Sequence, residues 1–336
     1  MTTTIKDVAL QAGCSIKTVS RVINNEPFVS VQTREKVLQA IETLDYAPNF
    51  SARRLVTRKS FTIGILLHEA GFYQSAILSK MMDISYQHDY DILLQSYFPS
   101  HNRSRVKLAQ LIHERRVDGL VVTPPCDVDP FLRQLLASAD IPQVQITPLN
   151  RSRQTAFVSG DDYQGAFLMT EHLINLGHNR IAYLTGPRNH RMSIDRLYGY
   201  RAALDTYAIP QDRNLVLDSE FTFAGGYTAA KIMLFSDTPP SAIFAGSDDA
   251  ALGALFAAQE LGWKVPEQLS ICGFNDLPQA QQTWPGLTTV SHPISDIVEK
   301  ATFMLLEILS GRPVKDKQII LPSKLIIRKS TGRVFE

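Results

Sequence analysis

Residues 4–24, TIKDVALQAGCSIKTVSRVIN, decide the fold of the first part of the chain. Thr4 is suited to cap a first helix, with Asp7 in the acidic position of a capping box three residues later. Gly13 permits a sharp turn that a side chain would obstruct, and Ser15 is suited to cap a second helix. Two short helices joined by a glycine turn at this spacing predict a helix-turn-helix motif.

The second helix has two different faces when its residues are placed at intervals of about 100°. The inner face, which matches the apolar residues of the first helix, consists of Ser15, Thr18, Val19, Val22 and Ile23. The outer face consists of Ile16, Lys17, Ser20, Arg21 and Asn24. A solvated surface has little reason to display Ile16, whereas a DNA major groove offers thymine methyl groups as apolar partners. On spacing alone, an ordinary helical hairpin with a charged face stays open as an alternative.

A third helix and a linker are predicted to follow. Ser30 is suited to cap a helix over 31–44, which completes a three-helix head, residues 1–46. In the next segment, 47–60, Pro48 ends the preceding helix and favours a new one. That new helix has barely two turns, too few to be stable by itself in water. We therefore expect a hinge helix or linker that becomes ordered only when something holds it.

Charge is unevenly distributed along the chain. Residues 1–60 contain nine lysines and arginines and five acidic residues, whereas residues 61–336 contain 25 and 28. A basic head on a slightly acidic body indicates a polyanionic partner for the head alone.

Cysteine and histidine usage indicates neither a metal site nor a disulfide framework. Cys14, Cys126 and Cys272 are far apart and lack C-x-x-C spacing, and the eight histidines do not cluster. This pattern is typical of a reducing compartment. The chain starts without a signal segment, and no apolar run approaches the ~20 residues of a membrane span. We therefore expect a cytoplasmic protein without a metal or cofactor.

From residue 61 onward, short apolar runs alternate with helix-period stretches. The runs typical of strands are 61–67, 91–97, 119–123, 143–147, 156–160, 180–186, 241–246 and 269–274. Helical stretches include 163–176, 224–235 and 249–261. This alternation predicts an α/β fold with parallel sheets covered on both faces. The number of units exceeds one ordinary sheet, which indicates two similar lobes with ligands beyond the carboxyl ends of their strands.

Motifs in a consistent order along the chain carry a resemblance to a known family. They include TVSRVIN at 18–24, DDAALG at 248–253 and GFND at 273–276. The other matching residues are 4–9, 12–13, 15, 29–30, 33–37, 44–49, 52–55, 117–120, 172–173, 176–178, 186–187, 196–197, 199–200 and 287–290. Together they resemble the lactose-repressor (LacI/GalR) family of bacterial transcription factors, over essentially the whole chain.

The resemblance implies a homodimeric repressor whose body is like a periplasmic sugar-binding protein in two lobes. An effector-binding and dimerisation domain, 61–336, is expected after the helix-turn-helix domain and the hinge. Its N-lobe is expected at about 61–158 and 291–322, and its C-lobe at about 159–290 and 323–332. The chain would cross between the lobes three times. A heptad tail for tetramer formation is missing from the sequence, so a dimer is expected.

For binding to double-stranded DNA, the resemblance assigns base reading to Ile16, Lys17 and Arg21. A lysine or arginine that donates to a guanine edge gives ~1–3 kcal/mol of discrimination. Phosphate anchors, which fix register without reading sequence, are expected at Ser15, Thr18, Asn24, Ser30, Thr33 and Arg53, and Ser20, Asn49 and Ala52 complete the interface. For the Thr18 hydroxyl, local capping is an equal alternative.

Leu55 carries a more specific hypothesis. It matches the leucine that the family wedges into the minor groove at the centre of a near-palindromic operator. A loose basic linker with a stray leucine is the alternative. Because the segment is expected to order only on DNA, the body would control whether two copies can meet.

For the effector, the resemblance places Arg196 in the cleft between the lobes. Asp248 and Asn275 follow strands of the C-lobe, and Phe221 is suited to stack on a sugar face. Further candidates at strand ends are Phe72, Tyr73, Thr123 and Ser193. A helix cap is the alternative for Asp248, and core packing is the alternative for Phe221. Asn275 stands where many relatives carry aspartate, which favours a neutral or N-acylated carbohydrate, although Arg196 is also compatible with a sugar acid or a phosphate.

Other functions lack their motifs in this sequence. A nucleophile elbow, a phosphate loop and a G-x-G-x-x-G motif are absent from the strand ends, so we do not expect an enzyme. A transported binding protein would have no use for residues 1–58. A ligand-dependent activator or a co-repressor-type regulator that responds to a non-sugar metabolite stays open.

Overall fold

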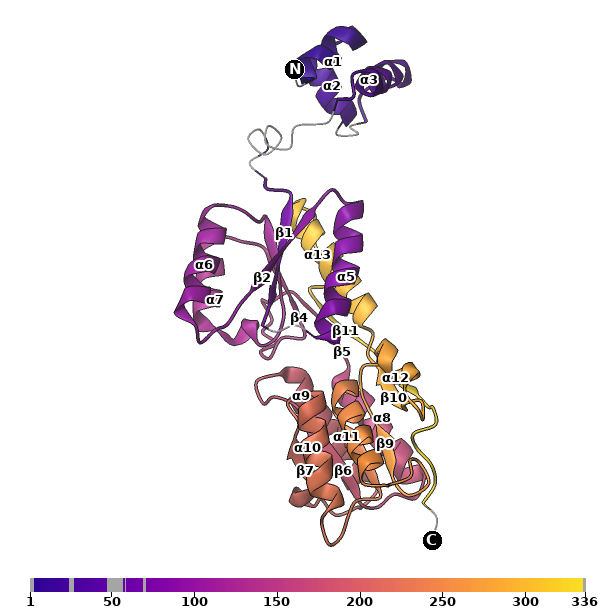
Figure 1. The fold of residues 1–336 in the computed structure, drawn as a ribbon. Coiled ribbons are helices and arrows are strands. Elements are labelled where there is room, and N and C mark those ends of the chain that lie inside the picture. The colour runs from indigo at the N-terminus through magenta and orange to yellow at the C-terminus, as the bar shows by residue number, and fades with distance from the viewer. Residues whose placement is uncertain (1–2, 24–26, 47–56, 58, 69–70, 335–336) are drawn as a thin grey trace. The chain divides into compact units, whose positions relative to one another are not determined.

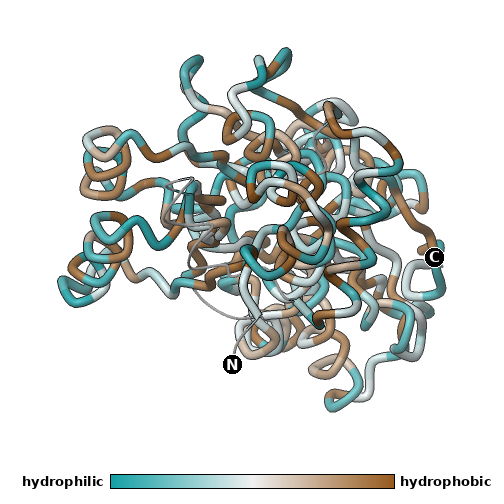
Figure 2. Tube along the Cα trace, turned by 90° about the horizontal axis from the view of Figure 1, so that it is seen from above, coloured by the Kyte–Doolittle hydropathy of each residue, from teal (hydrophilic) through white to brown (hydrophobic). Residues whose placement is uncertain are grey.

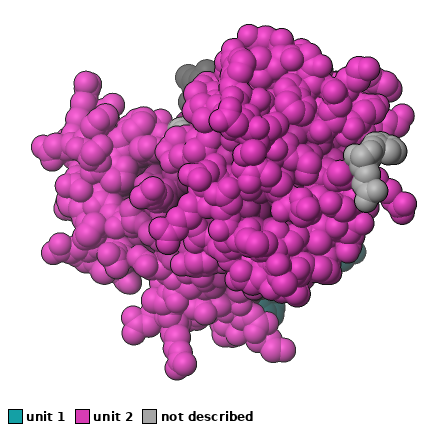
Figure 3. Space-filling model, turned by 90° about the horizontal axis from the view of Figure 1, so that it is seen from below, with its two compact units in different colours: residues 1–60 teal, residues 61–336 magenta. Residues whose placement is uncertain are grey.

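The computed structural model describes residues 3–23, 27–46, 57, 59–68 and 71–334 of the chain (Figure 1). The chain divides into two compact units, 1–60 and 61–336, which have different colours in Figure 3. We call them the head and the body. Among the described residues, no helix combines the length and the apolar character that crossing a bilayer requires.

The described part of the head folds into the helices α1 Ile5–Ala12, α2 Ile16–Ile23 and α3 Val31–Thr43. Gly13 makes the turn after α1 with φ +63°, a left-handed conformation that glycine adopts without steric cost. Val8, Val19 and Val37, one from each helix, are fully buried in the small core. The predicted helix-turn-helix arrangement is therefore confirmed, and its third helix ends one residue earlier than expected.

The larger sheet of the body has six parallel strands in the order β11–β5–β4–β3–β1–β2. Their bounds are β1 Thr62–Leu67, β2 Asp91–Ser96, β3 Gly119–Val122, β4 Gln143–Ile146, β5 Phe157–Gly160 and β11 Gln318–Leu321. The helices α5 Phe72–Gln87 and α13 Ile294–Leu309 cover one face, and α6 Asn102–His113 and α7 Pro130–Ala139 cover the other (Figure 1). We call this part the N-lobe; a short 3-10 turn, Cys126–Val128, precedes α7.

The smaller sheet has four parallel strands in the order β7–β6–β8–β9. Their bounds are β6 Ile181–Thr185, β7 Val216–Asp218, β8 Ala242–Ala245 and β9 Ser270–Cys272, with a 3-10 turn at Arg213–Leu215. The helices α8 Asp162–Asn175 and α9 Arg191–Thr206 pack on one face, and α10 Phe223–Leu234 and α11 Asp248–Glu260 on the other. An antiparallel pair, β10 Thr289–Ser291 and β12 Lys324–Ile326, and the short α12 Pro278–Gln282 complete this C-lobe.

Three short segments connect the lobes: they follow β5, β10 and β11. We call them the crossovers, residues 160–162, 291–294 and 321–324. β5 pairs with β4 and β11 up to Gly160, so the first crossover begins about two residues later than expected.

The α/β fold class is confirmed, and each of the eight predicted strands lies within its expected bounds. The strands β7, β10, β11 and β12 are not predicted by the sequence pattern, because most of their residues are half-buried or exposed. Such strands show little periodicity. In Figure 2, helices of the body carry both hydrophobic and hydrophilic positions, as expected for elements with one buried side.

Candidate functional site

The second helix of the helix-turn-helix, α2, presents part of the predicted outer face to solvent. Val19 and Val22 are buried against the head core, whereas Ile16 is 45% exposed and Lys17 is exposed. Ser20 and Arg21 are half-buried. An aliphatic and a basic side chain displayed together on one helix are suited to base edges in a major groove.

The starts of α2 and α3 have the same hydroxyl arrangement. Ser15 Oγ accepts from the Thr18 amide at 3.1 Å and lies 2.9 Å from the Thr18 hydroxyl. Ser30 Oγ accepts from the Thr33 amide at 3.3 Å and lies 2.8 Å from the Thr33 hydroxyl. The local alternative for Thr18 is therefore formed in this structure. Helix N-termini of this kind favour phosphate groups, because their amides and dipole point toward the anion.

Five residues of the expected DNA interface lie outside the described residues. They are Asn24, Asn49, Ala52, Arg53 and Leu55.

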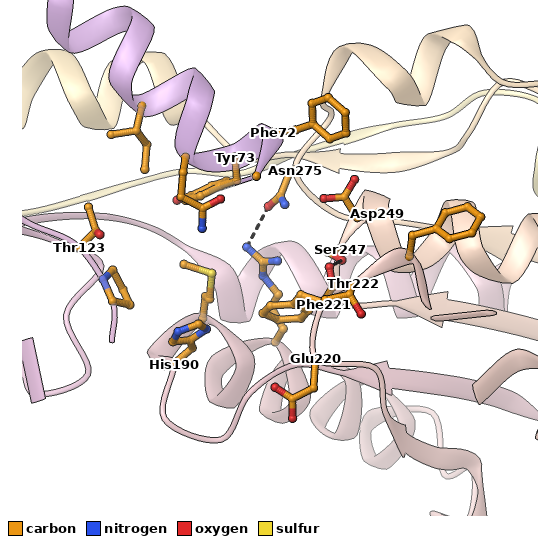
Figure 4. A pocket seen from close by; sticks show the side chains of 17 residues that line it. Phe72, Tyr73, Thr123, His190, Glu220, Phe221, Thr222, Ser247, Asp249 and Asn275 are labelled. Carbon is orange, nitrogen blue, oxygen red and sulfur yellow. Dashed lines mark hydrogen bonds between the residues drawn. The ribbon is translucent and has the colours of Figure 1, made fainter. Parts of the chain in front are cut away.

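A cavity of about 330 Å³ lies within the body and is lined by residues of both lobes. We call it the cleft cavity. Its lining consists of Gly71, Phe72, Tyr73, Gln74, Ile77, Thr123, Pro124, His190, Met192, Arg196, Glu220, Phe221, Thr222, Phe223, Ser247, Asp249 and Asn275 (Figure 4). These residues follow the carboxyl ends of β1, β3, β6, β7, β8 and β9, where ligands bind in parallel sheets.

Six of the eight residues expected at the effector site line this cavity. Phe72, Tyr73 and Thr123 come from the N-lobe, and Arg196, Phe221 and Asn275 come from the C-lobe. The structure thus brings together residues that are far apart in the sequence.

Asp248 does not line the cavity, contrary to expectation. Its carboxylate is fully buried and accepts from the Leu277 amide at 2.7 Å and from the Thr289 hydroxyl at 2.6 Å. Burial raises the pKa of Asp248 to about 7, although both hydrogen bonds act against the shift. The residue that caps α11 is Ser247, whose Oγ accepts from the Ala250 amide at 3.1 Å, so the helix-cap alternative for Asp248 is also wrong by one residue.

Ser193 does not line the cavity either. It is buried in the first turn of α9, where its hydroxyl accepts from the Gly186 amide at 3.1 Å. It therefore fixes the loop after β6 instead of facing the cavity.

Arg196 is fully buried, and partners inside the protein take up its donors. Nε donates to Asp162 at 2.8 Å, Nη1 to the Gly246 carbonyl at 2.5 Å, and Nη2 to Asn275 Oδ1 at 3.1 Å, the dashed line in Figure 4. The guanidinium lies 3.7 Å from the ring centre of Phe274. Burial alone would raise the pKa of Asp162, but the charges of Arg196 and His292 lower it to about 2. The two buried charges thus compensate each other.

The Phe221 ring packs against backbone from two strand ends. A β-carbon at Gly186 would lie 2.3 Å from the ring, and one at Gly246 would lie 2.7 Å from it. The Arg196 guanidinium is 5.4 Å from the ring centre. Phe221 is half-buried and has φ +59°, a conformation that places the ring in the cavity wall.

Several lining residues escape prediction from sequence, and Asp249 and His190 matter most among them. Asp249 lies in the first turn of α11, one residue after Asp248, which is the residue that the family motif suggests. The pKa of His190 falls to about 4, mainly because the ring is buried and also because of nearby His68 and Arg196, so it is neutral at pH 7. Locating either residue requires the position of the strand-to-helix junction, which the sequence pattern does not define to one residue.

The crossovers contribute buried polar side chains behind the cavity. His292 Nε2 lies 3.6 Å from Asp162 Oδ1, and the ring fits because residue 160 is glycine: a β-carbon there would lie 2.3 Å from Nε2. Asp162 Oδ2, both His292 nitrogens and Ser323 Oγ are buried and make no hydrogen bond to other described residues. Each crossover thus supplies one such side chain.

Both units match known protein families. Residues 4–49 match bacterial regulatory proteins of the lacI family, and residues 170–331 match a periplasmic binding protein-like domain. The chain is 31% identical to catabolite control protein A of Priestia megaterium over 336 residues, which covers 98% of this chain and 100% of that protein.

Solved structures show the same similarity. A complex of the transcriptional regulator CelR with cellobiose has a TM-score of 0.76 and 29% identity, and covers 98% of this chain and 99% of that one. The lac repressor dimer bound to operator and the anti-inducer ONPF has a TM-score of 0.82 and 29% identity, and covers 99% of this chain and 100% of that one.

Proposed function

The chain belongs to the lacI family of bacterial regulatory proteins, and on this premise we propose that it represses carbohydrate-use genes under the control of a sugar-like effector. The effector would bind in the cleft cavity between the lobes. The broader assignment needs no proposal: the chain is a LacI-family DNA-binding transcriptional repressor.

One observation carries the effector proposal: a single cavity has walls from both lobes and offers an aromatic ring beside polar groups. Phe221 provides an apolar face, and Asn275 and Asp249 provide hydrogen-bonding groups on the same wall (Figure 4). Sugars have apolar faces edged by hydroxyl groups, so they fit such a combination.

The position of the cavity gives the effector a means to act. A ligand that touches both lobes changes the balance between relative lobe positions if it binds one of them more tightly. The crossovers are the segments that must accommodate such a movement. In a homodimer, this change would decide whether two hinge segments can order on DNA.

On the DNA side, the proposal assigns base reading to Ile16, Lys17 and Arg21 and phosphate contacts to the starts of α2 and α3. The exposure of Ile16 and Lys17 and the capping geometry of the two helices support these roles, whereas Arg21 is half-buried. Leu55 is proposed to enter the minor groove at the centre of a near-palindromic operator. Selection of binding sites from random DNA tests this operator form, and a direct-repeat consensus would contradict it.

The effector proposal is tested by measuring the melting temperature of the full chain with a panel of neutral sugars, sugar acids and sugar phosphates. A true effector raises the melting temperature, because it binds the folded cavity, and changes the affinity for the selected operator. Phe221→Ala should remove most of the shift. Phe235→Ala is the matched control, because Phe235 is a 70% exposed phenylalanine of the same lobe.

The direction of the change in operator affinity separates induction from co-repression. A panel in which only non-sugar metabolites raise the melting temperature would replace the sugar proposal with the alternative of a regulator for another metabolite. Equal ligand shifts for Phe221→Ala and Phe235→Ala would move the binding site away from the cleft cavity.

A further inference from the structure

We infer that Arg151 and Asp195 form an ion-pair latch between the lobes, and that this latch positions the helix that carries Arg196. Arg151 lies in the N-lobe, in the loop between β4 and β5, and Asp195 lies in α9 of the C-lobe. Arg151 Nη2 donates to Asp195 Oδ2 at 3.3 Å. Neither residue lines the cleft cavity, so this contact is separate from the proposed effector site.

The latch is largely shielded from water. The side chain of Asp195 is 10% exposed and that of Arg151 is 21% exposed. At such positions the attraction between opposite charges is stronger, and salt screens it less, than at the surface. The pair can therefore bias the relative position of the lobes, whereas a fully solvated pair would contribute little.

Each partner of the latch keeps a second partner in its own lobe. Arg151 Nη2 also donates to Ser159 Oγ on β5 at 3.1 Å. Within α9, Arg191 Nε donates to Asp195 Oδ1 at 2.8 Å. Breaking a buried ion pair is usually costly because it leaves a charge unpaired. Here separation of the lobes leaves both charged groups with a hydrogen-bond partner, so the latch can open and close reversibly.

A second cavity lies beside the latch. It has a volume of about 350 Å³, and its lining includes Arg151, Arg191 and Asp195 as well as the first crossover. Water can enter a polar space of this size and solvate the two charges when they separate. The cavity thus lowers the cost of opening further.

The latch and the cleft cavity use two faces of the same turn of α9. Arg191 and Asp195 lie on the latch side. Met192 and Arg196 line the cleft cavity. Because Asp195 directly precedes Arg196, a movement of the helix at the latch also moves the guanidinium in the cavity wall. Under the proposed function, an effector that favours another lobe position must open the latch, and one that favours the present position is helped by it.

Interlobe distances test the latch in the full chain, without an effector or DNA. Spin labels are placed at two exposed positions, Glu114→Cys in the N-lobe and Asp237→Cys in the C-lobe, and Cys14→Ser removes the half-exposed thiol. The thiols of Cys126 and Cys272 are buried and stay unlabelled. Double electron-electron resonance then gives the distance between the labels. Dilution with unlabelled protein makes the distance within one protomer dominate.

Substitution of Arg151 should change this distance through its charge. Arg151→Glu sets two carboxylates against each other and should lower the population of the wild-type distance, relative to other distances, about tenfold. Arg151→Lys keeps the charge and should keep the wild-type distance. Arg153→Glu is the matched control, because Arg153 is an exposed arginine of the same loop. An unchanged distance in Arg151→Glu, or equal shifts in Arg151→Glu and Arg151→Lys, overturns the inference.

Operator binding separates the latch from the proposed function. Arg151→Glu should change the affinity of the full chain for the selected operator at least about fivefold, whereas Arg153→Glu, which has the same change of charge, should not. A shifted distance with an unchanged operator affinity supports the latch and contradicts the proposal that lobe position controls DNA binding.

Discussion

The recognition helix and the cleft cavity both contain basic side chains, in opposite settings. Lys17 is exposed on α2, beside an exposed Ile16. Arg196 is fully buried against Asp162. A solvated cation keeps its attraction for a polyanion, whereas a buried cation paired with a carboxylate mainly organises its surroundings. A basic residue therefore indicates an anionic partner only once its partners within the protein are known.

Removal of the buried cation should cost the most stability. Arg196→Ala leaves Asp162 as an unpaired buried charge and should lower the free energy of unfolding by about 3–5 kcal/mol. Arg191→Ala, in the same helix but at a partly exposed ion pair with Asp195, should cost less than about 1 kcal/mol. Urea denaturation of the full chain measures both. Similar losses for the two variants would show that Arg196 does not organise the cavity.

The buried Asp248 carboxyl should make the free energy of unfolding depend on pH. Its pKa is about 7 in the folded protein and 3.8 ordinarily, so between these values the folded state holds a proton that the unfolded state has released. This contribution to stability is present below about pH 4 and is lost as the pH rises to 7. Asp248→Asn should remove that decline, which is about 4 kcal/mol at most. Denaturation from pH 4.5 to 8 measures it, and a profile that keeps the decline would contradict the assignment.

Exposed Lys17 should contribute to DNA binding and not to the stability of the fold. Lys17→Ala should weaken binding to the selected operator by about 1–3 kcal/mol and relax specificity at one base pair. Lys36→Ala removes the same charge from an exposed position on α3 and should affect operator and random DNA alike. Fluorescence anisotropy at several salt concentrations measures both. Equal losses on the two DNAs for Lys17→Ala would reduce Lys17 to a phosphate contact.

Substitution of the proposed wedge residue in the hinge should have a smaller effect. Leu55→Ala should reduce operator affinity about tenfold while changing random DNA little, because an inserted side chain depends on a deformable base step. Arg58→Ala should instead weaken both complexes and reduce the salt slope by about 1. The same titrations distinguish the two, and a uniform loss for Leu55→Ala would reject the wedge.

Prediction from sequence succeeded where periodicity or a motif decides position. The eight strands have enough apolar residues to stand out, and the helix-turn-helix is local, so both are predicted. Six of the eight expected effector residues line the cavity, in keeping with the rule that ligand sites follow strand ends, but the other eleven of its seventeen described lining residues are not predicted. The expectation for Asp248 is wrong because its side chain is buried, whereas those of the adjacent Ser247 and Asp249 line the cavity. Which of these side chains faces the cavity depends on which residue caps α11, and the sequence does not define that residue.

The state of Arg196 could not be predicted from sequence. Its compensation depends on Asp162 in a crossover and on Asn275 in another loop, which tertiary packing alone brings within hydrogen-bond distance. The spacing of these residues in the sequence does not predict these contacts.

The packing of the crossovers requires a glycine at position 160. Its missing side chain makes room for an imidazole that belongs to a different crossover, and that imidazole is 6.1 Å from Phe274, the ring that lies on Arg196. An alanine at position 160 would collide with the His292 ring, whose centre lies 6.0 Å from that of Tyr73 and 6.1 Å from that of Phe274. One methyl group, added outside the cavity, would thus alter the shape that a ligand meets.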